Sequence, residues 1–195
     1  MKKRIGIMGG TFDPIHIGHL IAAEQAREQG RLDEVWFLPT YAPPHKKESP
    51  AGTPEQRLEM VRRAVNGHPR FAVCDLEIRR GGISYSADTV EALTEEYPDV
   101  HFLFIIGADM VEYLPRWHRI GDIAARIGFI GLARPGYTLA PDLPSWLKDK
   151  VTLVTMPQIE LSSSEIRSRV RAGRSIRYLV PGAVQEYIEE NGLYV

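Results

Sequence analysis

The stretch that decides the fold of this chain is Gly9-Gly10-Thr11-Phe12-Asp13-Pro14-Ile15-His16-Ile17-Gly18-His19, which directly follows an apolar run at residues 5–8. A short strand that runs into a glycine turn and then a helix places free backbone N–H groups and the positive end of the helix dipole at one point in space. The two histidines stand three residues apart, on the same side of the first helical turn. This stretch therefore predicts a site that binds phosphate groups.

The composition limits the classes of protein to which the chain can belong. With 195 residues, 44% of them hydrophobic, the chain is long enough for one domain with a sizeable core. Its formal net charge of −1 argues against a general nucleic-acid surface, which carries a marked basic excess. The single cysteine, Cys74, excludes an internal disulfide and a cysteine-based zinc site, and we expect it to be buried in a strand.

Strand-like apolar runs alternate with helical patterns along most of the sequence. We expect strands at residues 4–8, 35–39, 71–76, 102–107, 127–133 and 151–156, and helices at 17–29, 54–65, 86–96, 163–172 and 181–190. Several strands are apolar on consecutive residues, as in a parallel sheet covered on both faces. The pattern predicts an α/β fold in which residues 1–195 form a single domain, a doubly wound, Rossmann-like parallel sheet with a short helical C-terminal part.

Two further expectations follow from this organisation. In doubly wound sheets, ligands bind beyond the carboxyl ends of the strands. Gly9-Gly10 and Gly107-Ala108-Asp109 both follow predicted strands, so we expect them to face one crevice. No apolar stretch approaches the roughly 18 residues of a membrane span, and we expect a soluble, cytoplasmic protein without a membrane partner.

His16 and His19 are open to more than one chemical use. Zinc would need a third protein ligand at suitable spacing, and the sequence has neither an H-E-x-x-H pattern nor a Cys–His set. A histidine nucleophile is not excluded by the sequence, although direct transfer is simpler. As hydrogen-bond donors to oxygens that gain charge when pyrophosphate leaves, the imidazoles would each contribute about 3–4 kcal/mol to the stability of the transition state.

A second anion site is predicted by Leu161-Ser162-Ser163-Ser164-Glu165-Ile166-Arg167. Ser162 and Glu165 have the spacing of a capping box, so a helix begins here. Arg167 lies four residues after Ser163 and on the same face of that helix. Hydroxyl groups, free N–H groups and a guanidinium at one helix start suit a phosphate, whereas the alternative is a capped surface helix with solvated arginines. A nucleoside triphosphate has enough phosphates to span both helix starts.

The G-G-T-F-D-P-x-H-x-G-H run and the S-S-S-E-I-R segment resemble those of the nucleotidyltransferase superfamily of adenylyl and cytidylyl transferases. The H-I-G-H letters also occur in class I aminoacyl-tRNA synthetases, but those enzymes are far longer and carry a K-M-S-K-S-type loop. Within the superfamily, the chain is most similar to the bacterial nicotinate-nucleotide adenylyltransferases. Beyond the two motifs, this closer resemblance rests on Trp36-Phe37-Leu38-Pro39, Pro43-Pro44-His45-Lys46, Ser84-Tyr85-Ser86-Ala87-Asp88-Thr89, Ile106-Gly107-Ala108-Asp109, Leu114-Pro115-Arg116-Trp117 and Ala133-Arg134-Pro135-Gly136-Tyr137.

The resemblance implies adenylyl transfer from ATP to nicotinate mononucleotide in NAD biosynthesis, with Mg²⁺ carried on the ATP phosphates and no metal ligand from the protein. It implies small-molecule partners and no nucleic acid, and it leaves a homo-oligomer open. The residues implied to bind ATP are Gly9, Gly10, Thr11, Phe12, His16, His19, Gly107, Asp109, Ser163 and Arg167, of which His16, His19 and Arg167 are implied to be catalytic. The residues implied to bind the nicotinate substrate are Thr11, Lys46, Ser86, Trp117 and Arg134.

Two positions near the implied acceptor pocket depart from the family pattern. Ser86 stands where relatives often have Thr, which keeps the hydroxyl, and His118 follows Trp117 where relatives often have Lys or Tyr. The sequence thus leaves open how strictly nicotinate is preferred over nicotinamide. Two other functions also stay open: a pantetheine-phosphate adenylyltransferase, which shares both phosphate motifs, and a non-catalytic nucleotide sensor.

Overall fold

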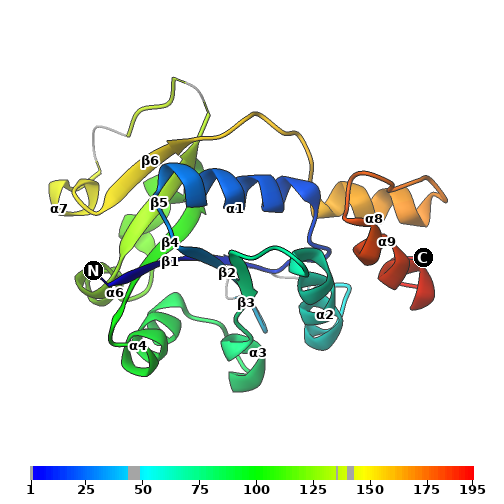
Figure 1. Ribbon diagram of the computed structural model, residues 1–195, viewed down its shortest axis with the longest axis horizontal. Helices are drawn as coiled ribbons and strands as arrows, with labels where there is room; N and C mark the ends of the chain where they lie inside the picture. Colours follow the sequence, from blue (N-terminus) through cyan, green and yellow to red (C-terminus); the bar gives the residue numbers. More distant parts are fainter. Residues whose placement is uncertain (1, 44–48, 135, 140–142) are drawn as a thin grey trace.

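Six parallel strands form one sheet in the computed structural model, which describes residues 2–43, 49–134, 136–139 and 143–195 (Figure 1). The strand order is β3-β2-β1-β4-β5-β6: the chain adds strands outward on one side of β1 and then, from β4 on, outward on the other side, so the switch point lies between β1 and β4. The strands are β1 (Lys3–Gly10), β2 (Glu34–Pro39), β3 (Phe71–Val73), β4 (Val100–Gly107), β5 (Gly128–Ala133) and β6 (Val151–Thr155). This arrangement confirms the doubly wound, Rossmann-like sheet that the alternating pattern predicts.

Helices cover both faces of this sheet. They are α1 (Ile17–Gln29), α2 (Pro54–Val65), α3 (Leu76–Arg80), α4 (Ser86–Glu96), α5 (Ala108–Tyr113), α6 (Ile120–Arg126), α7 (Ser145–Lys148), α8 (Ser163–Arg171) and α9 (Gly182–Glu190), with a 3₁₀ turn, η1, at Leu114–Arg116. Helix α1 lies over one face and α4 over the other, while α8 and α9 gather at one end of the molecule (Figure 1). None of the helices in the described ranges combines the length and the apolar character needed to cross a bilayer.

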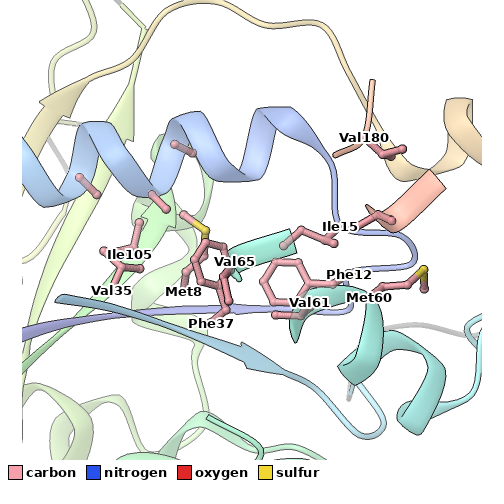
Figure 2. Close-up of a cluster of buried hydrophobic side chains, with 14 of the residues drawn as sticks. Met8, Phe12, Ile15, Val35, Phe37, Met60, Val61, Val65, Ile105 and Val180 are labelled. Atoms are coloured by element: carbon pink, nitrogen blue, oxygen red, sulfur yellow. The ribbon is translucent and has the colours of Figure 1, made fainter. Parts of the chain in front are cut away.

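The two apolar cores follow from the alternation of side chains along β1. Ile5 and Ile7 are buried on the face covered by α4 to α7. Met8 points to the opposite face, where the core also contains Phe12 and Ile15 from the segment after β1 (Figure 2). Each of these large apolar side chains contributes about 1.5–3 kcal/mol to the stability of the fold through its burial. Because Phe12 and Ile15 are part of the core, their packing fixes the conformation of the segment between β1 and α1.

The helix starts that carry strong capping signals lie where the sequence predicts them. Thr53 accepts a hydrogen bond from the Gln56 backbone at 3.3 Å, and the Gln56 side chain accepts one from the Thr53 N–H at 2.9 Å. Such a reciprocal pair satisfies two backbone donors that a helix start leaves free. The predicted bounds of α1, α2 and α4 are confirmed.

The predicted strand at residues 71–76 is too long. The edge strand β3 pairs only with Val35–Phe37 of β2 and ends at Val73. Beyond it the chain turns into α3, where the Arg79 side chain binds Asp75 at 2.7 Å, four residues back. Cys74 therefore lies outside the sheet and is half-buried, so the prediction of a cysteine buried in a strand is wrong. Partial burial raises the pKa of the Cys74 thiol.

Candidate functional site

The glycines after the apolar run of β1 belong to the strand itself. Gly9 and Gly10 pair with Leu38 and Pro39 of β2, so the turn begins at Thr11 and not at Gly9 as the sequence suggests. A Cβ atom at Gly9 would meet no protein atom within 4 Å. Packing therefore gives no reason for glycine at this position, and the open space beside its backbone is available to a ligand.

The segment that follows Gly10 is held in an unusual conformation. Phe12 has a φ of +50°, in the left-handed region that non-glycine residues seldom adopt. Its ring is 3% exposed and packs against Phe37, with the two centroids 5.9 Å apart. The edge of the same ring meets His19 at 5.1 Å between centroids. Burial of Phe12 thus fixes the turn and, through it, the place of His19.

His16 and His19 form one stacked unit at the start of α1. Their ring centroids are 3.7 Å apart and the rings are inclined by 22°. The backbone N–H of His16 donates to Nδ1 of His19 at 3.2 Å. Because Nδ1 accepts this hydrogen bond, a neutral His19 carries its proton on Nε2, where it is free to be donated.

Both histidines are uncharged near neutral pH in the ligand-free protein. Burial lowers the pKa of His16 from its usual 6.5 to about 4. Burial lowers the pKa of His19 to about 3, and the adjacent His16 ring adds to the effect. In addition, Nδ1 of His16 is buried and has no hydrogen-bond partner among the described residues. The pair therefore offers imidazole N–H groups, not fixed positive charges, to an incoming anion.

The second predicted anion site lies against the same turn. Ser163, the first residue of α8, donates its hydroxyl to the carbonyl of Pro14 at 2.9 Å. Arg167 donates from its guanidinium to the carbonyl of Asp13 at 2.7 Å. Ser162 accepts from the backbone N–H of Glu165 at 3.2 Å, which is the expected cap of α8. The starts of α1 and α8 thus converge on the Asp13–Pro14 turn, although they are about 150 residues apart in sequence.

A cavity of about 540 Å³ opens beside this turn, at the carboxyl ends of β1, β2 and β4. Seven of the predicted site residues line it: Gly9, Gly10, Thr11, His19, Ser86, Gly107 and Trp117. The Trp117 ring stands edge-on to Phe104 and Phe129, with centroid distances of 6.0 and 6.3 Å. The cavity thus has a fixed aromatic side, and its volume suits a nucleotide-sized ligand.

The other predicted residues lie outside the lining of this cavity. Phe12 is in the core, and His16 lies behind His19. Asp109 is exposed in the first turn of α5, and Arg134 is exposed directly after β5. Ser163 and Arg167 lie at the start of α8, against the turn described above. Lys46 falls outside the described residues.

Several residues of the cavity were not singled out from the sequence. Glu77 of α3 is 3% exposed; one of its oxygens accepts the Thr89 hydroxyl at 2.6 Å, and the other has no hydrogen-bond partner in the described part of the chain. Burial raises the pKa of the Glu77 carboxyl. Thr40 and Met110 also line the cavity, together with His118, which the family resemblance places near the acceptor pocket, and with Ser84 and Tyr85 of a segment on which that resemblance rests. In the sequence, the sign that Glu77 is buried is its position between two apolar residues, Leu76 and Ile78.

A buried arginine connects the turn to its surroundings and was also missed. Arg57 of α2 is fully buried. Its guanidinium donates to the carbonyl oxygens of Thr11 and Thr40, both at 2.7 Å, and to those of Tyr41 and Gly52 at 3.0 and 3.2 Å. The signal in the sequence was a cation on the buried face of α2, one turn before Met60 and Val61.

The chain is similar to known proteins over nearly its whole length. A family model described as cytidylyltransferase-like matches residues 7–169. A protein of Oceanobacillus iheyensis, described as a probable nicotinate-nucleotide adenylyltransferase, is 46% identical over 192 residues, which cover 98% of this chain and 97% of that protein. A protein of Geobacillus thermodenitrificans with the same description is 50% identical over 191 residues, or 98% of this chain and 86% of that protein.

Solved structures with the same fold include a Plasmodium falciparum nicotinic acid mononucleotide adenylyltransferase complexed with NaAD. Its TM-score is 0.78 at 22% identity, and the match covers 98% of this chain and 97% of that one. The same enzyme complexed with APC gives a TM-score of 0.75 at 22% identity, with the same coverage. At this level of identity the two structures support the fold.

Proposed function

Because the chain belongs to the cytidylyltransferase-like family and is similar, over nearly its whole length, to nicotinate-nucleotide adenylyltransferases, we propose that it transfers the adenylyl group of ATP to nicotinate mononucleotide. The products are nicotinate adenine dinucleotide and pyrophosphate. We include in this proposal that residues 1–195 form one nucleotidyltransferase domain, since the family match covers residues 7–169 and Ser163, near the end of that range, bonds to Pro14, near its start. We also propose that the protein works in the cytoplasm.

The observation that carries this proposal is the convergence of two helix starts on the Asp13–Pro14 turn, next to a cavity with an aromatic side. The starts of α1 and α8 bring Ser163, Arg167 and the histidine pair to one place. Free N–H groups, hydroxyl groups and a guanidinium are the donors that bind polyphosphates. The adjacent 540 Å³ cavity has room for an acceptor beside them.

On the ATP side, the backbone of Gly9 to Phe12 would line the turn that receives phosphate groups of both substrates, including the α-phosphate of ATP. His19, through its free Nε2–H, and His16 would donate to the oxygens of the phosphorus under attack. Ser163 and Arg167 would bind the β- and γ-phosphates as they leave. Gly107 and Asp109, at the junction of β4 and α5, would lie along the adenosine.

On the acceptor side, the pyridine ring of nicotinate mononucleotide would stack on Trp117. Ser86, which lines the same cavity, would donate its hydroxyl to the nicotinate carboxylate. Arg134 and Lys46 are assigned to the acceptor phosphate by resemblance. Offset stacking between aromatic rings adds about 0.5–1.5 kcal/mol to the effect of area burial, which suits Trp117 as the anchor of the ring.

The reaction is an in-line attack by the acceptor phosphate on the α-phosphorus of ATP. That phosphate is already largely ionised near pH 7, so no general base is required. The protein's contribution is then positioning and neutralisation of charge, as is usual in phosphoryl-type transfer. We propose that Mg²⁺ enters as the MgATP complex, because phosphate oxygens are ligands that this ion prefers. Within the described ranges no group of three or more His, Cys, Asp or Glu side chains is arranged to hold a metal.

Pyrophosphate release from MgATP tests the proposal, with nicotinate mononucleotide, nicotinamide mononucleotide and phosphopantetheine compared as acceptors. Turnover with the first acceptor supports the proposal, and a strong preference for it over the second shows that Ser86 and His118 preserve selectivity for the acid. Turnover with phosphopantetheine alone would assign the chain to a different adenylyltransferase. If no acceptor leads to pyrophosphate release, the remaining function would be nucleotide binding without catalysis.

A further inference from the structure

The Asp13 carboxylate is the centre of a buried hydrogen-bond network in the segment between β1 and α1, residues 11–16, which we call the phosphate turn. The residue is 4% exposed. Its Oδ2 accepts the backbone N–H of Ala51 at 2.8 Å, and its Oδ1 accepts the backbone N–H of Gly52 at 3.0 Å. Oδ1 also accepts the Tyr194 hydroxyl at 2.8 Å. These three donors hold the carboxylate in one orientation and compensate for its removal from water.

Tyr194 reaches this carboxylate from the far end of the chain. Its hydroxyl bonds to a residue 181 positions earlier. The side chain is 9% exposed and belongs to the core that contains Phe12 and Met60. Burial and the neighbouring Asp13 raise the pKa of the Tyr194 hydroxyl, so the group stays protonated and can only donate to the carboxylate.

The space around Asp13 and Tyr194 is filled closely. A Cβ atom added to Gly52 would lie 3.1 Å from Asp13 Oδ1 and 3.5 Å from the Tyr194 hydroxyl. A side chain at residue 52 would therefore crowd the carboxylate, which would have to shift by a few tenths of an ångström. The contact is thus part of the packing of the fold.

The same carboxylate stands beside Arg167. The guanidinium NH1 is 2.7 Å from the backbone carbonyl of Asp13 and 3.7 Å from its Oδ2. A carboxylate free to turn toward this guanidinium would form a closer ion pair with it. Asp13 therefore competes with phosphate for Arg167, and the orientation of the carboxylate decides how much of the guanidinium is left for a ligand.

We propose that Tyr194 is a positioning residue for the phosphate-binding site: its hydroxyl, together with the backbone N–H groups of Ala51 and Gly52, keeps the Asp13 carboxylate from closing on Arg167 beyond the 3.7 Å contact. This leaves the guanidinium available to pyrophosphate and to the β- and γ-phosphates of ATP. This inference rests on the proposed function, because it assigns Arg167 to those phosphates. Tyr194 touches no substrate, and it acts through Asp13 and Arg167.

Tyr194→Phe tests the inference because it removes the hydroxyl and keeps the ring. We expect the KM for MgATP and the Kd for inorganic pyrophosphate, measured by calorimetry, to rise roughly three- to tenfold, since the Asp13 carboxylate, with one donor fewer, would pair more closely with Arg167 and compete with phosphate for it. The KM for nicotinate mononucleotide stays unchanged. A purely structural loss would lower the active fraction and hence kcat, with both KM values as in the wild type.

Tyr187→Phe is the matched control, because this tyrosine lies on α9 and stacks on Arg63, away from Asp13. A cycle with Arg167→Ala adds a second test: the effect of Tyr194→Phe on pyrophosphate affinity should disappear when the guanidinium is absent. All assays are run where thermal melting shows each variant to be folded. An unchanged pyrophosphate Kd in Tyr194→Phe, or an equal effect in the Arg167→Ala background, would overturn the inference. A wild-type protein that binds pyrophosphate but transfers no adenylyl group would instead contradict the proposed function.

Discussion

The rings of His16 and His19 are stacked with their centroids 3.7 Å apart, and the backbone N–H of His16 fixes the tautomer of His19 by donating to its Nδ1. A pair arranged this way has one defined proton on Nε2 of His19, next to the cavity. The stacking also makes a double positive charge unfavourable, because two imidazolium rings would face each other across a short gap with little water between them.

We expect His19→Ala to lower kcat by about 10²–10³-fold while the KM for MgATP changes only a few-fold. The reason is that a donor aimed at the reacting phosphorus strengthens its hydrogen bond as charge develops in the transition state. His16→Ala should show the same pattern, since it also removes the support of the His19 ring. Steady-state kinetics on both variants provide the measurement. Loss of MgATP affinity at unchanged kcat would assign the histidines to ground-state binding.

The stability of the protein should fall as the pH decreases from about 6.5 toward 4. An unfolded histidine takes up a proton near pH 6.5, whereas the folded pKa values of His16 and His19 are about 4 and 3. Below pH 6.5 the unfolded state therefore binds more protons, and the two sites together cost roughly 2–4 kcal/mol of unfolding free energy at pH 5. Urea unfolding between pH 7.5 and 5 measures this slope.

The double variant His16→Asn/His19→Asn is the control for this pH effect. It should have a flatter dependence of stability on pH than the wild type. The comparison separates the histidines from groups such as Glu77, whose pKa burial shifts in the opposite direction. Parallel curves for the two proteins would mean that the pKa values of the two histidines are the same in the folded and unfolded states.

Gly9→Ala should leave the stability of the protein within about 0.5 kcal/mol of the wild type and yet raise the KM for MgATP at least tenfold. The added methyl group meets no protein atom within 4 Å, and it enters the space beside the strand where a phosphate would lie. Gly10→Ala is a useful contrast, because its Cβ would stand 3.0 Å from the Phe12 ring and should lower the melting temperature as well. Wild-type kinetics in Gly9→Ala would place the phosphates elsewhere.

Trp117→Ala should raise the KM for nicotinate mononucleotide about tenfold or more and change the KM for MgATP little, because stacking and apolar contact with the ring are lost. Trp117→Phe, which keeps a smaller aromatic face, should restore most of the affinity. Kinetics with each substrate varied in turn separate the two effects. A rise in the KM for MgATP alone would assign this side of the cavity to the adenine.

The sequence predicts the parts of this fold whose signals are local. The helices α1, α2 and α4 begin where caps or periodicity indicate, and the two phosphate motifs are recognisable because each lies within one short segment. The short helices α3 and α5 to α7 have too few residues for a helical period to appear, and most were not predicted. Neither motif carries a local signal that the other lies beside it in the fold.

The contacts that support the site were less predictable, for a physical reason. Arg57 bonds to carbonyl oxygens 5 to 46 residues away, and Tyr194 bonds to Asp13 across 181 residues. Such pairs depend on how α2 and the C-terminal turn pack against the sheet, and neither residue type carries a signal for its partner. A charged residue on the apolar face of a helix is the one warning that the sequence offers.

The distance in sequence between Asp13 and its partners gives the phosphate turn an order of assembly during synthesis. The turn leaves the ribosome early, Arg57 follows, and α8 and Tyr194 come some 150 and 181 residues later. At roughly 5–20 residues per second, about ten seconds or more pass before the turn can acquire its last two partners. A nascent chain that already contains the complete histidine motif therefore still lacks Arg167 and the Tyr194 contact to Asp13. On the proposed assignment of Arg167, polyphosphate binding would arise only when the C-terminal segment has docked.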